Sequence, residues 1–225
     1  VPENSMAAFR RALEHGFGAE LDVHLMADGE LAVVHDSSLK RVCGADVHIE
    51  DLTAADLERY PLIGSGETIP LFREVLELFE GKTPLVIELK VERGNANALT
   101  DAVMAALEGW RGVCCVESFH PAALLRLKER YPQVLRGQLS QNFLKPGEAN
   151  GLSLPVRFML TNLLTTAATR PDFIAYSCKD RDNASLRLMR ALYGVHEVGW
   201  TVRDRETMEA LDREGAASIF EGFVP

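Results

Sequence analysis

Apolar residues recur along the chain at two spacings, which together predict alternating strands and helices. From residue 85 onward, short apolar runs alternate with segments of helical period. The predicted strands cover 85–90, 113–118, 135–139, 173–177, 195–202 and 218–220. The predicted helices cover 96–107, 121–130, 156–168, 184–192 and 205–213. Strands that alternate with helices form a parallel sheet covered by helices, so the sequence predicts an α/β fold.

The N-terminal part of the chain follows a different pattern. A helix is predicted over Asn4–His15, with Asn4 as its N-cap, and a strand over Ala19–Leu25. Asp28-Gly29 separates this strand from a second one, Leu31–His35, as is typical of a β-hairpin. Residues 36–69 are polar and rich in turn residues, with one short helix over 54–60, and a further helix is predicted over 71–79. We interpret 27–70 as a hairpin and small insertion within a single domain that spans 1–225.

The strand count predicts a closed barrel. Without the second strand of the hairpin, seven core strands remain; no strand precedes the first helix, and no helix follows 218–220. Eight βα units close into a barrel of roughly 250 residues. We therefore predict a TIM-type (β/α)8 barrel with a small insertion after its second strand, whose first strand and last helix are missing from this chain. An open doubly wound sheet is the alternative.

Composition and charge exclude several classes of protein. The 225 residues include 24 Lys and Arg against 33 Asp and Glu, a formal net charge of −9, and 47% are hydrophobic, which is enough to bury a core. The acidic balance argues against nucleic-acid binding. No apolar run approaches the roughly 18 residues that stable membrane insertion requires. The four cysteines form no CxxC pair and are too few for a disulfide scaffold, so we expect reduced thiols and a cytoplasmic protein.

Carboxylates interrupt two strands that should be apolar. Glu20 and Asp22 share one face of the strand 19–25, and Glu88 and Lys90 repeat this arrangement in 85–90. Buried carboxylates that converge repel one another unless a cation lies among them, so we predict a divalent metal. Ligand sets made only of oxygen favour Mg²⁺, Ca²⁺ or Mn²⁺ over zinc. The alternative is that these residues face water at the strand ends or pair with Lys90.

One histidine is a candidate for proton transfer. His35 ends the strand that returns from the one carrying Glu20 and Asp22, so we expect it beside the acidic residues. Histidine exchanges protons near neutral pH, and a role as metal ligand is the alternative. We expect the other five histidines to be structural.

The chain resembles the glycerophosphodiester phosphodiesterase family in an ordered set of motifs. The motifs that carry the resemblance are Pro2-Glu3-Asn4-Ser5, Glu20-Leu21-Asp22-Val23, Asp28-Gly29, Val34-His35-Asp36, Ile69-Pro70-Leu71, Glu88-Leu89-Lys90, Glu117-Ser118-Phe119, Gly199-Trp200-Thr201-Val202 and Ser218-Ile219-Phe220. Each motif alone is a weak signal, but their order along nearly the whole chain is specific.

The resemblance implies a barrel enzyme that hydrolyses glycerophosphodiesters, which are small molecules, to an alcohol and sn-glycerol 3-phosphate. It implies a divalent metal, Mg²⁺ or Ca²⁺ with Mn²⁺ as an alternative, on three matched ligands: Glu20, Asp22 and Glu88. By position, His35 matches a catalytic histidine and Lys90 a residue near the phosphate. Trp200 matches a residue that lines the substrate pocket, for which a place in the core is the alternative. The motifs specify neither the head group nor the oligomeric state.

Two departures from the family pattern leave other functions open. The family has a His-Arg-Gly upstream of the Pro-Glu-Asn element, so we expect a preceding strand to supply a second catalytic histidine. Phe220-Glu221-Gly222-Phe223 replaces the family's Thr-Asp pair. The alternatives are a non-catalytic barrel that binds phosphodiesters and a phospholipase D-like phosphodiesterase on a related barrel.

Overall fold

The computed structural model describes residues 1–147 and 151–225. The chain divides into two compact units, Val1–Val134 and Leu135–Pro225. The single domain over 1–225 stays a prediction.

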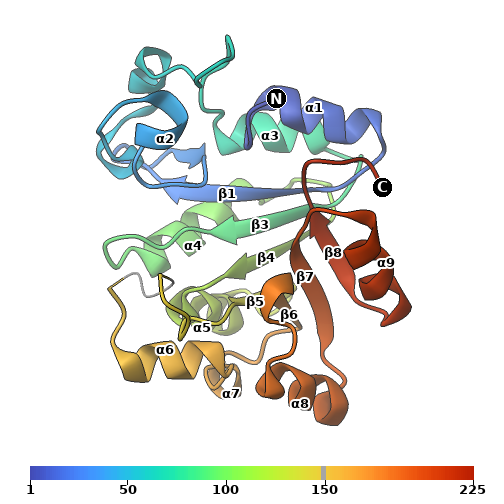
Figure 1. Ribbon diagram of the computed structural model, residues 1–225. Helices are drawn as coiled ribbons and strands as arrows, with labels where there is room; N and C mark the ends of the chain where they lie inside the picture. The colour runs from blue at the N-terminus through green and yellow to red at the C-terminus, as the bar shows by residue number, and fades with distance from the viewer. Residues whose placement is uncertain (148–150) are drawn as a thin grey trace. The chain divides into compact units, whose positions relative to one another are not determined.

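The first unit alternates helices with four strands (Figure 1). Its strands are β1 (Ala19–Leu25), β2 (Leu31–Val33), β3 (Leu85–Leu89) and β4 (Cys114–Ser118). Its helices are α1 (Met6–Glu14), α2 (Lys40–Cys43), α3 (Phe72–Phe79), α4 (Ala96–Ala106) and α5 (Pro121–Arg130), with 3-10 helices η1 (Ile49–Asp51) and η2 (Ala54–Arg59). Strand β3 lies parallel between β1 and β4, and β2 pairs antiparallel with β1. The predicted hairpin is therefore present.

The parallel strands of this unit have one apolar and one acidic face. Leu21 of β1 and Ile87 of β3 are fully buried in a cluster that includes residues of α1, α3, α4 and α5. Each such side chain contributes about 1.5–3 kcal/mol through burial. Because successive side chains of a strand point to opposite faces, Glu20, Asp22 and Glu88 lie on the face away from this cluster.

Gly18 fixes where β1 begins relative to β3. A Cβ atom at Gly18 would lie 2.7 Å from the carbonyl oxygen of Pro84, so no larger residue fits there without a shift of the backbone. The amide of Ala19 donates a hydrogen bond of 3.1 Å to the same oxygen. This contact sets Ala19 opposite Leu85, and the register that follows sets Asp22 opposite Glu88.

The segment between β2 and α3 has an apolar cluster of its own. Leu39 and Ile49 are fully buried in it, together with Leu57 and Ile69. Backbone hydrogen bonds close the segment, among them one of 2.9 Å from the amide of Ile49 to the carbonyl of Ser37. The region of the predicted insertion therefore folds around a small core.

The second unit continues the alternation with four parallel strands. Its strands are β5 (Arg136–Ser140), β6 (Phe173–Ser177), β7 (His196–Val202) and β8 (Ala217–Phe220). Its helices are α6 (Leu154–Thr161), α7 (Thr166–Thr169), α8 (Ala184–Tyr193) and α9 (Arg205–Arg213), with the 3-10 helix η3 (Cys178–Asp180). Ile174 and Tyr176 of β6 are fully buried against Leu186 of α8. All seven predicted core strands are present, with bounds that shift by one residue or less.

The predicted helix over 156–168 is wrong, because two short helices replace it. Leu163 between them has a φ of 57°, in the left-handed region that ends a helix. Side chains of neighbouring strands bind the last carbonyl groups of α6. The Ser140 hydroxyl donates a hydrogen bond of 2.7 Å to the carbonyl oxygen of Leu160, and the Tyr176 hydroxyl donates one of 2.9 Å to that of Thr161. These bonds replace those of a further helical turn.

Three smaller predictions also need correction. Ser5, not Asn4, is the N-cap of α1, because its hydroxyl accepts the amide of Ala8 at 3.2 Å. The helix predicted over 54–60 is the 3-10 helix η2. Strand β2 ends at Val33, so His35 lies in the turn that follows it.

None of the helices in the described part of the chain combines the length and the apolar character that crossing a bilayer requires.

Candidate active site

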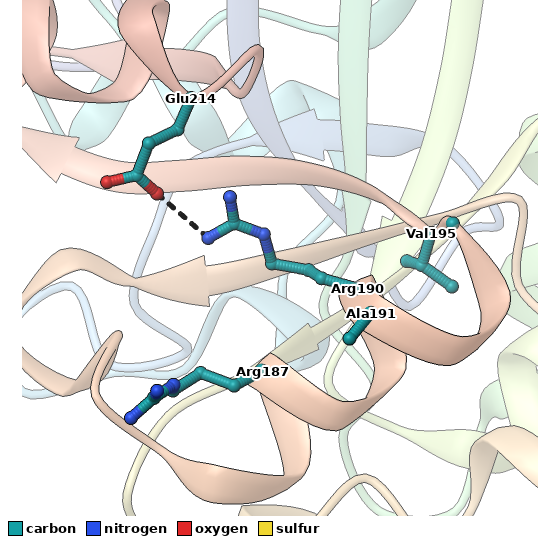
Figure 2. A pocket seen from close by; sticks show the side chains of 6 residues that line it. Arg187, Arg190, Ala191, Val195 and Glu214 are labelled. Carbon is teal, nitrogen blue, oxygen red and sulfur yellow. Dashed lines mark hydrogen bonds and ion pairs between the residues drawn. The ribbon is translucent and has the colours of Figure 1, made fainter.

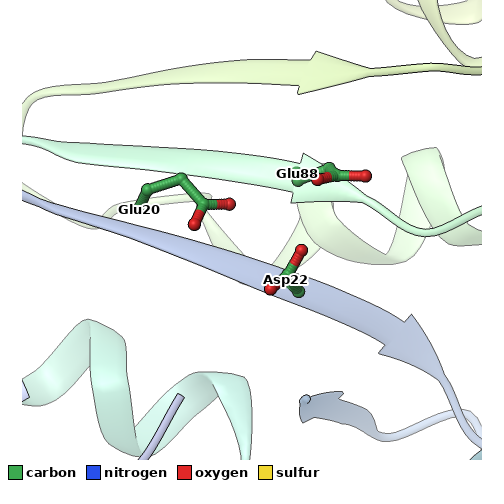
Figure 3. Close-up of side chains that lie close together, drawn as sticks. All are labelled: Glu20, Asp22 and Glu88. Carbon is green, nitrogen blue, oxygen red and sulfur yellow. The ribbon is translucent and has the colours of Figure 1, made fainter. Parts of the chain in front are cut away.

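Three carboxylates form a row across the acidic face of the first unit. Asp22 of β1 is in register with Glu88 of β3, which is in register with Glu117 of β4. Glu20 lies two residues before Asp22 on the same face of β1. Figure 3 shows Glu20, Asp22 and Glu88 gathered between the neighbouring strands β1 and β3. The row follows directly from the parallel register.

The structure brings together the three predicted metal ligands. One carboxylate oxygen each of Glu20, Asp22 and Glu88 lie within 4.8 Å of one another. Asp22 and Glu88 are buried, and Glu20 is half-buried. Three acidic oxygens this close in a buried place repel one another, and this acidic cluster could hold a divalent cation.

Lys90 faces the cluster from the residue after β3. Its Nζ donates hydrogen bonds of 3.0 Å to both Asp22 Oδ1 and Glu88 Oε1, and its side chain is 13% exposed. The carboxylates outweigh the effect of burial and raise the pKa of Lys90, which therefore stays cationic. One lysine cannot neutralise every carboxylate of the group.

The pKa values of the cluster show this excess of negative charge. Burial raises the pKa of Glu88 to about 8, against the opposing effect of Lys90. Burial, and then the charges of Asp22 and Glu88, raise the pKa of Glu20 well above its usual value. Burial acts in the same direction on Asp22, but Lys90, His35 and Asn4 outweigh it and lower the pKa of Asp22. Without a further cation, part of the cluster must carry protons at neutral pH.

Glu117 is a further member of this group, which the sequence marks only as part of a family motif. Its side chain is buried, with 1% exposure, and its Oε2 makes no hydrogen bond with any residue that the structure describes. Burial and the charges of Glu88 and Asp22 raise its pKa. The same signal that singled out Glu88, an acid inside an apolar strand, is present in Val116-Glu117. An unsatisfied buried acid beside three others fits a site that receives a cation.

Asn4 positions one of the predicted ligands. Its Nδ2 donates a hydrogen bond of 2.7 Å to Asp22 Oδ2, and its Oδ1 accepts one of 3.3 Å from the backbone amide of Asp22. Asn4 has a φ of 50°, in the left-handed region that asparagine adopts more readily than most residues. The residue predicted as an N-cap therefore holds Asp22 instead.

His35 lies close enough to the cluster to lower the pKa of Asp22. Its ring is 54% exposed, and its Nδ1 lies 2.7 Å from Asp36 Oδ1. Burial raises the pKa of Asp36, but the hydrogen bonds from Arg41 and His35 outweigh burial and lower this pKa. Asp36 is therefore a carboxylate, which accepts the proton on Nδ1 of His35. Arg41 in turn is paired with both Asp36 and Glu3. This chain of contacts orients the imidazole and leaves its Nε2 for another partner.

His24 supports the backbone of His35. It is buried, with Nδ1 at 2.7 Å from Glu50 Oε1 and Nε2 at 3.3 Å from the carbonyl oxygen of His35. Glu50 also accepts 2.7 Å from the Ser37 hydroxyl. His24 is thus part of the structure that carries His35, as expected for a structural histidine.

Trp200 belongs to strand β7 of the second unit and is half-buried. It lines a cavity of about 190 Å³ together with Ser177, Thr201 and several charged residues. The alternative, a place in the core, is only partly fulfilled, since the indole is half-buried and borders this cavity. The predicted substrate-binding role of Trp200 stays a prediction.

A second hollow in this unit, of about 470 Å³, lies beside α8 (Figure 2). Arg190 lies 2.9 Å from both Glu197 and Glu214. Arg181 pairs with the same two carboxylates, so two positive and two negative charges neutralise one another. Val195, one of the residues that line this hollow, precedes β7, so it lies at the amino end of that strand. Active sites of this fold lie at the opposite, carboxyl ends of the strands.

Comparison with known proteins identifies the family. A family model described as the glycerophosphoryl diester phosphodiesterase family matches residues 1–224. The chain belongs to this family. A glycerophosphodiester phosphodiesterase of Caldanaerobacter subterraneus subsp. tengcongensis is 33% identical over 229 residues, covering 97% of this chain and 88% of that protein.

Two solved structures show the same fold. A phosphodiesterase of Oleispira antarctica in complex with the product sn-glycerol-3-phosphate has a TM-score of 0.80 at 22% identity, covering 97% of this chain and 87% of its own. A glycerophosphodiester phosphodiesterase of Thermotoga maritima has a TM-score of 0.73 at 26% identity, covering 98% and 88%. The predicted α/β fold of the TIM-barrel type and the predicted enzyme class, a glycerophosphodiester phosphodiesterase, are confirmed.

In this phosphodiesterase, we expect divalent-metal affinity to rise with pH. Burial raises the pKa of Glu88 to about 8, so if Glu88 is a ligand, as predicted, a cation that binds below that pH displaces its proton. Affinity should therefore increase as the pH rises from 6 to 9, with protons released on binding. Calorimetric titration with MgCl₂ in two buffers of different ionisation enthalpy measures this release. Equal heats in both buffers at pH 7 would contradict the raised pKa.

Proposed function

We propose that the acidic cluster holds one divalent metal on Glu20, Asp22 and Glu88 and that this site hydrolyses glycerophosphodiesters to an alcohol and sn-glycerol 3-phosphate. The observation that carries the proposal is the approach of three carboxylate oxygens to within 4.8 Å in a largely buried place. The unsatisfied Oε2 of Glu117 supports it. Oxygen-only ligands favour Mg²⁺ or Ca²⁺, with Mn²⁺ as the alternative.

Charge is the first requirement of the reaction. A phosphodiester is an anion, and attack on its phosphorus adds negative charge to the phosphoryl oxygens. A bound divalent metal supplies neutralisation of that charge. Lys90 adds a fixed ammonium group at the same place, because Asp22 and Glu88 hold its Nζ from two sides. We assign Lys90 to the phosphate on this ground.

Protonation of the leaving oxygen is the second requirement. The bond between phosphorus and the alcohol oxygen breaks with both electrons on oxygen, and an alkoxide leaves poorly unless it receives a proton. We assign this donation to His35: Asp36 accepts the proton on Nδ1, so the doubly protonated ring would donate its second proton from Nε2. Over one turnover, a water molecule supplies the oxygen that bonds to phosphorus. One of its protons replaces the proton that His35 gives to the alcohol, and the other stays on the glycerol 3-phosphate or passes to solvent, so the protons balance.

Metal dependence is the direct test. Hydrolysis of glycerophosphoglycerol can be measured by ³¹P NMR spectroscopy, as the rate at which glycerol 3-phosphate appears. Purified protein treated with EDTA should lose this activity. Addition of MgCl₂, CaCl₂ or MnCl₂ in separate samples should restore it and identify the preferred ion. Full turnover after removal of bound metal, verified by elemental analysis, would contradict the proposal.

A further inference from the structure

Helices α6 and α8 of the second unit carry large apolar side chains that face solvent. Leu154 and Phe158 of α6 are 66% and 52% exposed, and Leu188 and Leu192 of α8 are 55% and 66% exposed. The members of each pair lie four residues apart, on one face of their helix. Three further exposed residues lie next to them in the sequence: Met159, Leu164 and Tyr193. We call these seven residues the α6–α8 surface. Soluble proteins rarely gather exposed apolar side chains in this way unless something binds them.

The two helices cover the same face of the second unit's sheet. Ile174 and Tyr176 lie two residues apart, on one face of β6, and both pack in one buried cluster with Leu163 and Leu186. Leu163 follows α6 and Leu186 belongs to α8. Figure 1 shows α6 and α8 on this side, and a hydrogen bond joins the end of α6 to the start of α8. The exposed side chains lie about half a turn around each helix from the buried ones, so they point away from the sheet together.

The helices of this surface contain no acidic residue. Helices α6, α7 and α8 include three arginines and no Asp or Glu, in a chain with 33 Asp and Glu against 24 Lys and Arg. The next helix, α9, carries three acidic residues, so the absence is particular to this surface. The α6–α8 surface therefore has the opposite sign of charge from the chain as a whole.

Two cations beside this surface are available to bind an anion. Arg187 of α8 is exposed and forms no ion pair with any residue in 1–147 or 151–225. Figure 2 shows its side chain apart from the ion pair of Arg190 and Glu214. Arg170, directly after α7, is also exposed, and no carboxylate in the described part of the chain pairs with it. Exposed guanidinium groups beside apolar side chains suit a partner that offers both phosphate groups and hydrocarbon.

A second copy of this chain would fit the surface poorly. In a closed twofold dimer the same patch meets itself, so Arg187 would approach the arginines of the other copy. No carboxylate of α6, α7 or α8 lies between them to compensate the charge. Like charges placed together in an interface are unfavourable. The lipid phosphates of a bilayer supply the missing negative charge, and its acyl region accepts the apolar side chains.

We propose that the α6–α8 surface docks on the surface of a bilayer that contains anionic phospholipids. The apolar side chains of α6 and α8 enter the boundary between head groups and acyl chains, and Arg170 and Arg187 bind lipid phosphates. This is peripheral attachment, which needs no helix that spans the bilayer. The proposal concerns the second unit alone, and it holds whichever reaction the acidic cluster of the first unit performs.

The test measures binding of the full chain to lipid vesicles by co-sedimentation. One set of vesicles contains phosphatidylcholine alone, and the other contains equimolar phosphatidylcholine and phosphatidylglycerol. We expect the protein to bind the anionic vesicles at least about tenfold more tightly, because each basic residue near an anionic surface contributes about 1 kcal/mol. Binding should weaken as NaCl is added, because salt screens this attraction.

Variants with matched controls locate the docking surface. Leu192→Ser should weaken binding to anionic vesicles about tenfold, because it removes an apolar side chain from the bilayer. Ile63→Ser is its control, since Ile63 of the first unit is 62% exposed and Leu192 is 66% exposed. Arg187→Glu should also weaken binding about tenfold. Its control is Arg111→Glu, at an exposed arginine between α4 and β4, which changes the net charge equally. Both controls should bind as wild type does.

A fold check accompanies these measurements. Leu192 and Arg187 are exposed, so both variants should keep the Tm of wild type and its rate on glycerophosphoglycerol, a substrate free in solution. Phe158→Ser on α6 is a second apolar variant, which should weaken binding as Leu192→Ser does.

Three results would overturn the proposal. The first is a wild-type protein that binds neither kind of vesicle, or both equally. The second is equal binding by wild type, Leu192→Ser and Phe158→Ser, or an equal loss in Ile63→Ser and Arg111→Glu. The third is a wild-type dimer in analytical ultracentrifugation that ignores vesicles and that Leu192→Ser dissociates, because the surface would then belong to a second copy of the chain.

Discussion

Replacing Glu88 by glutamine should abolish metal-dependent hydrolysis while the protein stays folded. Glu88 contributes an oxygen to the trio within 4.8 Å, and an amide in its place removes one negative charge from the proposed ligand set. Loss of a group that stabilises charge in the transition state costs about a hundred- to a thousandfold in kcat. Calorimetry should show the loss of divalent binding in parallel.

The stability of the metal-free variant separates loss of metal from loss of fold. An acid whose pKa is raised by folding, from 4.5 to about 8 for Glu88, holds its proton more tightly when folded. Its stabilising contribution is complete below about pH 4.5 and is lost as the pH rises toward 8. Glu88→Gln has no such proton to lose, so its unfolding free energy without metal should fall less than that of wild type over this range.

Glu92→Gln is the matched control for this experiment. Glu92 is exposed and lies four residues after Glu88. It is not one of the three residues whose carboxylate oxygens lie within 4.8 Å of one another. It should retain both activity and the rise in Tm that MgCl₂ produces. Unchanged metal affinity in Glu88→Gln would show that the ion, if any, binds elsewhere.

The sequence predicts the acidic cluster because two simple periodicities meet there. Glu20, Asp22 and Glu88 interrupt apolar strands at alternating positions, and parallel strands place such positions side by side. Glu117 carries the same signal but stands beside Ser118 at a strand end, where a polar residue is ordinary. Only the register opposite Glu88 shows that it belongs to the group.

Contacts between distant residues account for what the sequence did not predict. Asn4 reads as an N-cap because of its neighbours, yet its bonds go to Asp22, eighteen residues away. The break between α6 and α7 depends on Ser140 and Tyr176, which belong to strands β5 and β6. Local propensity does not contain these partners, and tertiary hydrogen bonds override it here.

The pairing that orients His35 lies between these two cases. Asp36 follows His35 directly in the sequence, and Arg41 lies within reach five residues later, so the motif brings the three groups together. The ion pair between Arg41 and Glu3, which lies 38 residues earlier, does not follow from the local sequence. The motif therefore predicts the histidine, and the fold shows how its Nδ1 is held.

Replacing His35 by alanine should slow hydrolysis in a way that depends on the leaving group. If His35 donates the proton, the variant should hydrolyse a substrate whose leaving group is glycerol about a hundred- to ten-thousandfold more slowly, because this is the usual contribution of a general acid. A p-nitrophenyl ester of glycerol 3-phosphate should lose far less, because p-nitrophenolate departs without a proton. His196→Ala, at an exposed histidine at the start of β7, should slow neither substrate. Equal losses on both substrates, with divalent affinity reduced as well, would show that His35 binds the metal or the phosphate and that another group protonates the leaving alcohol.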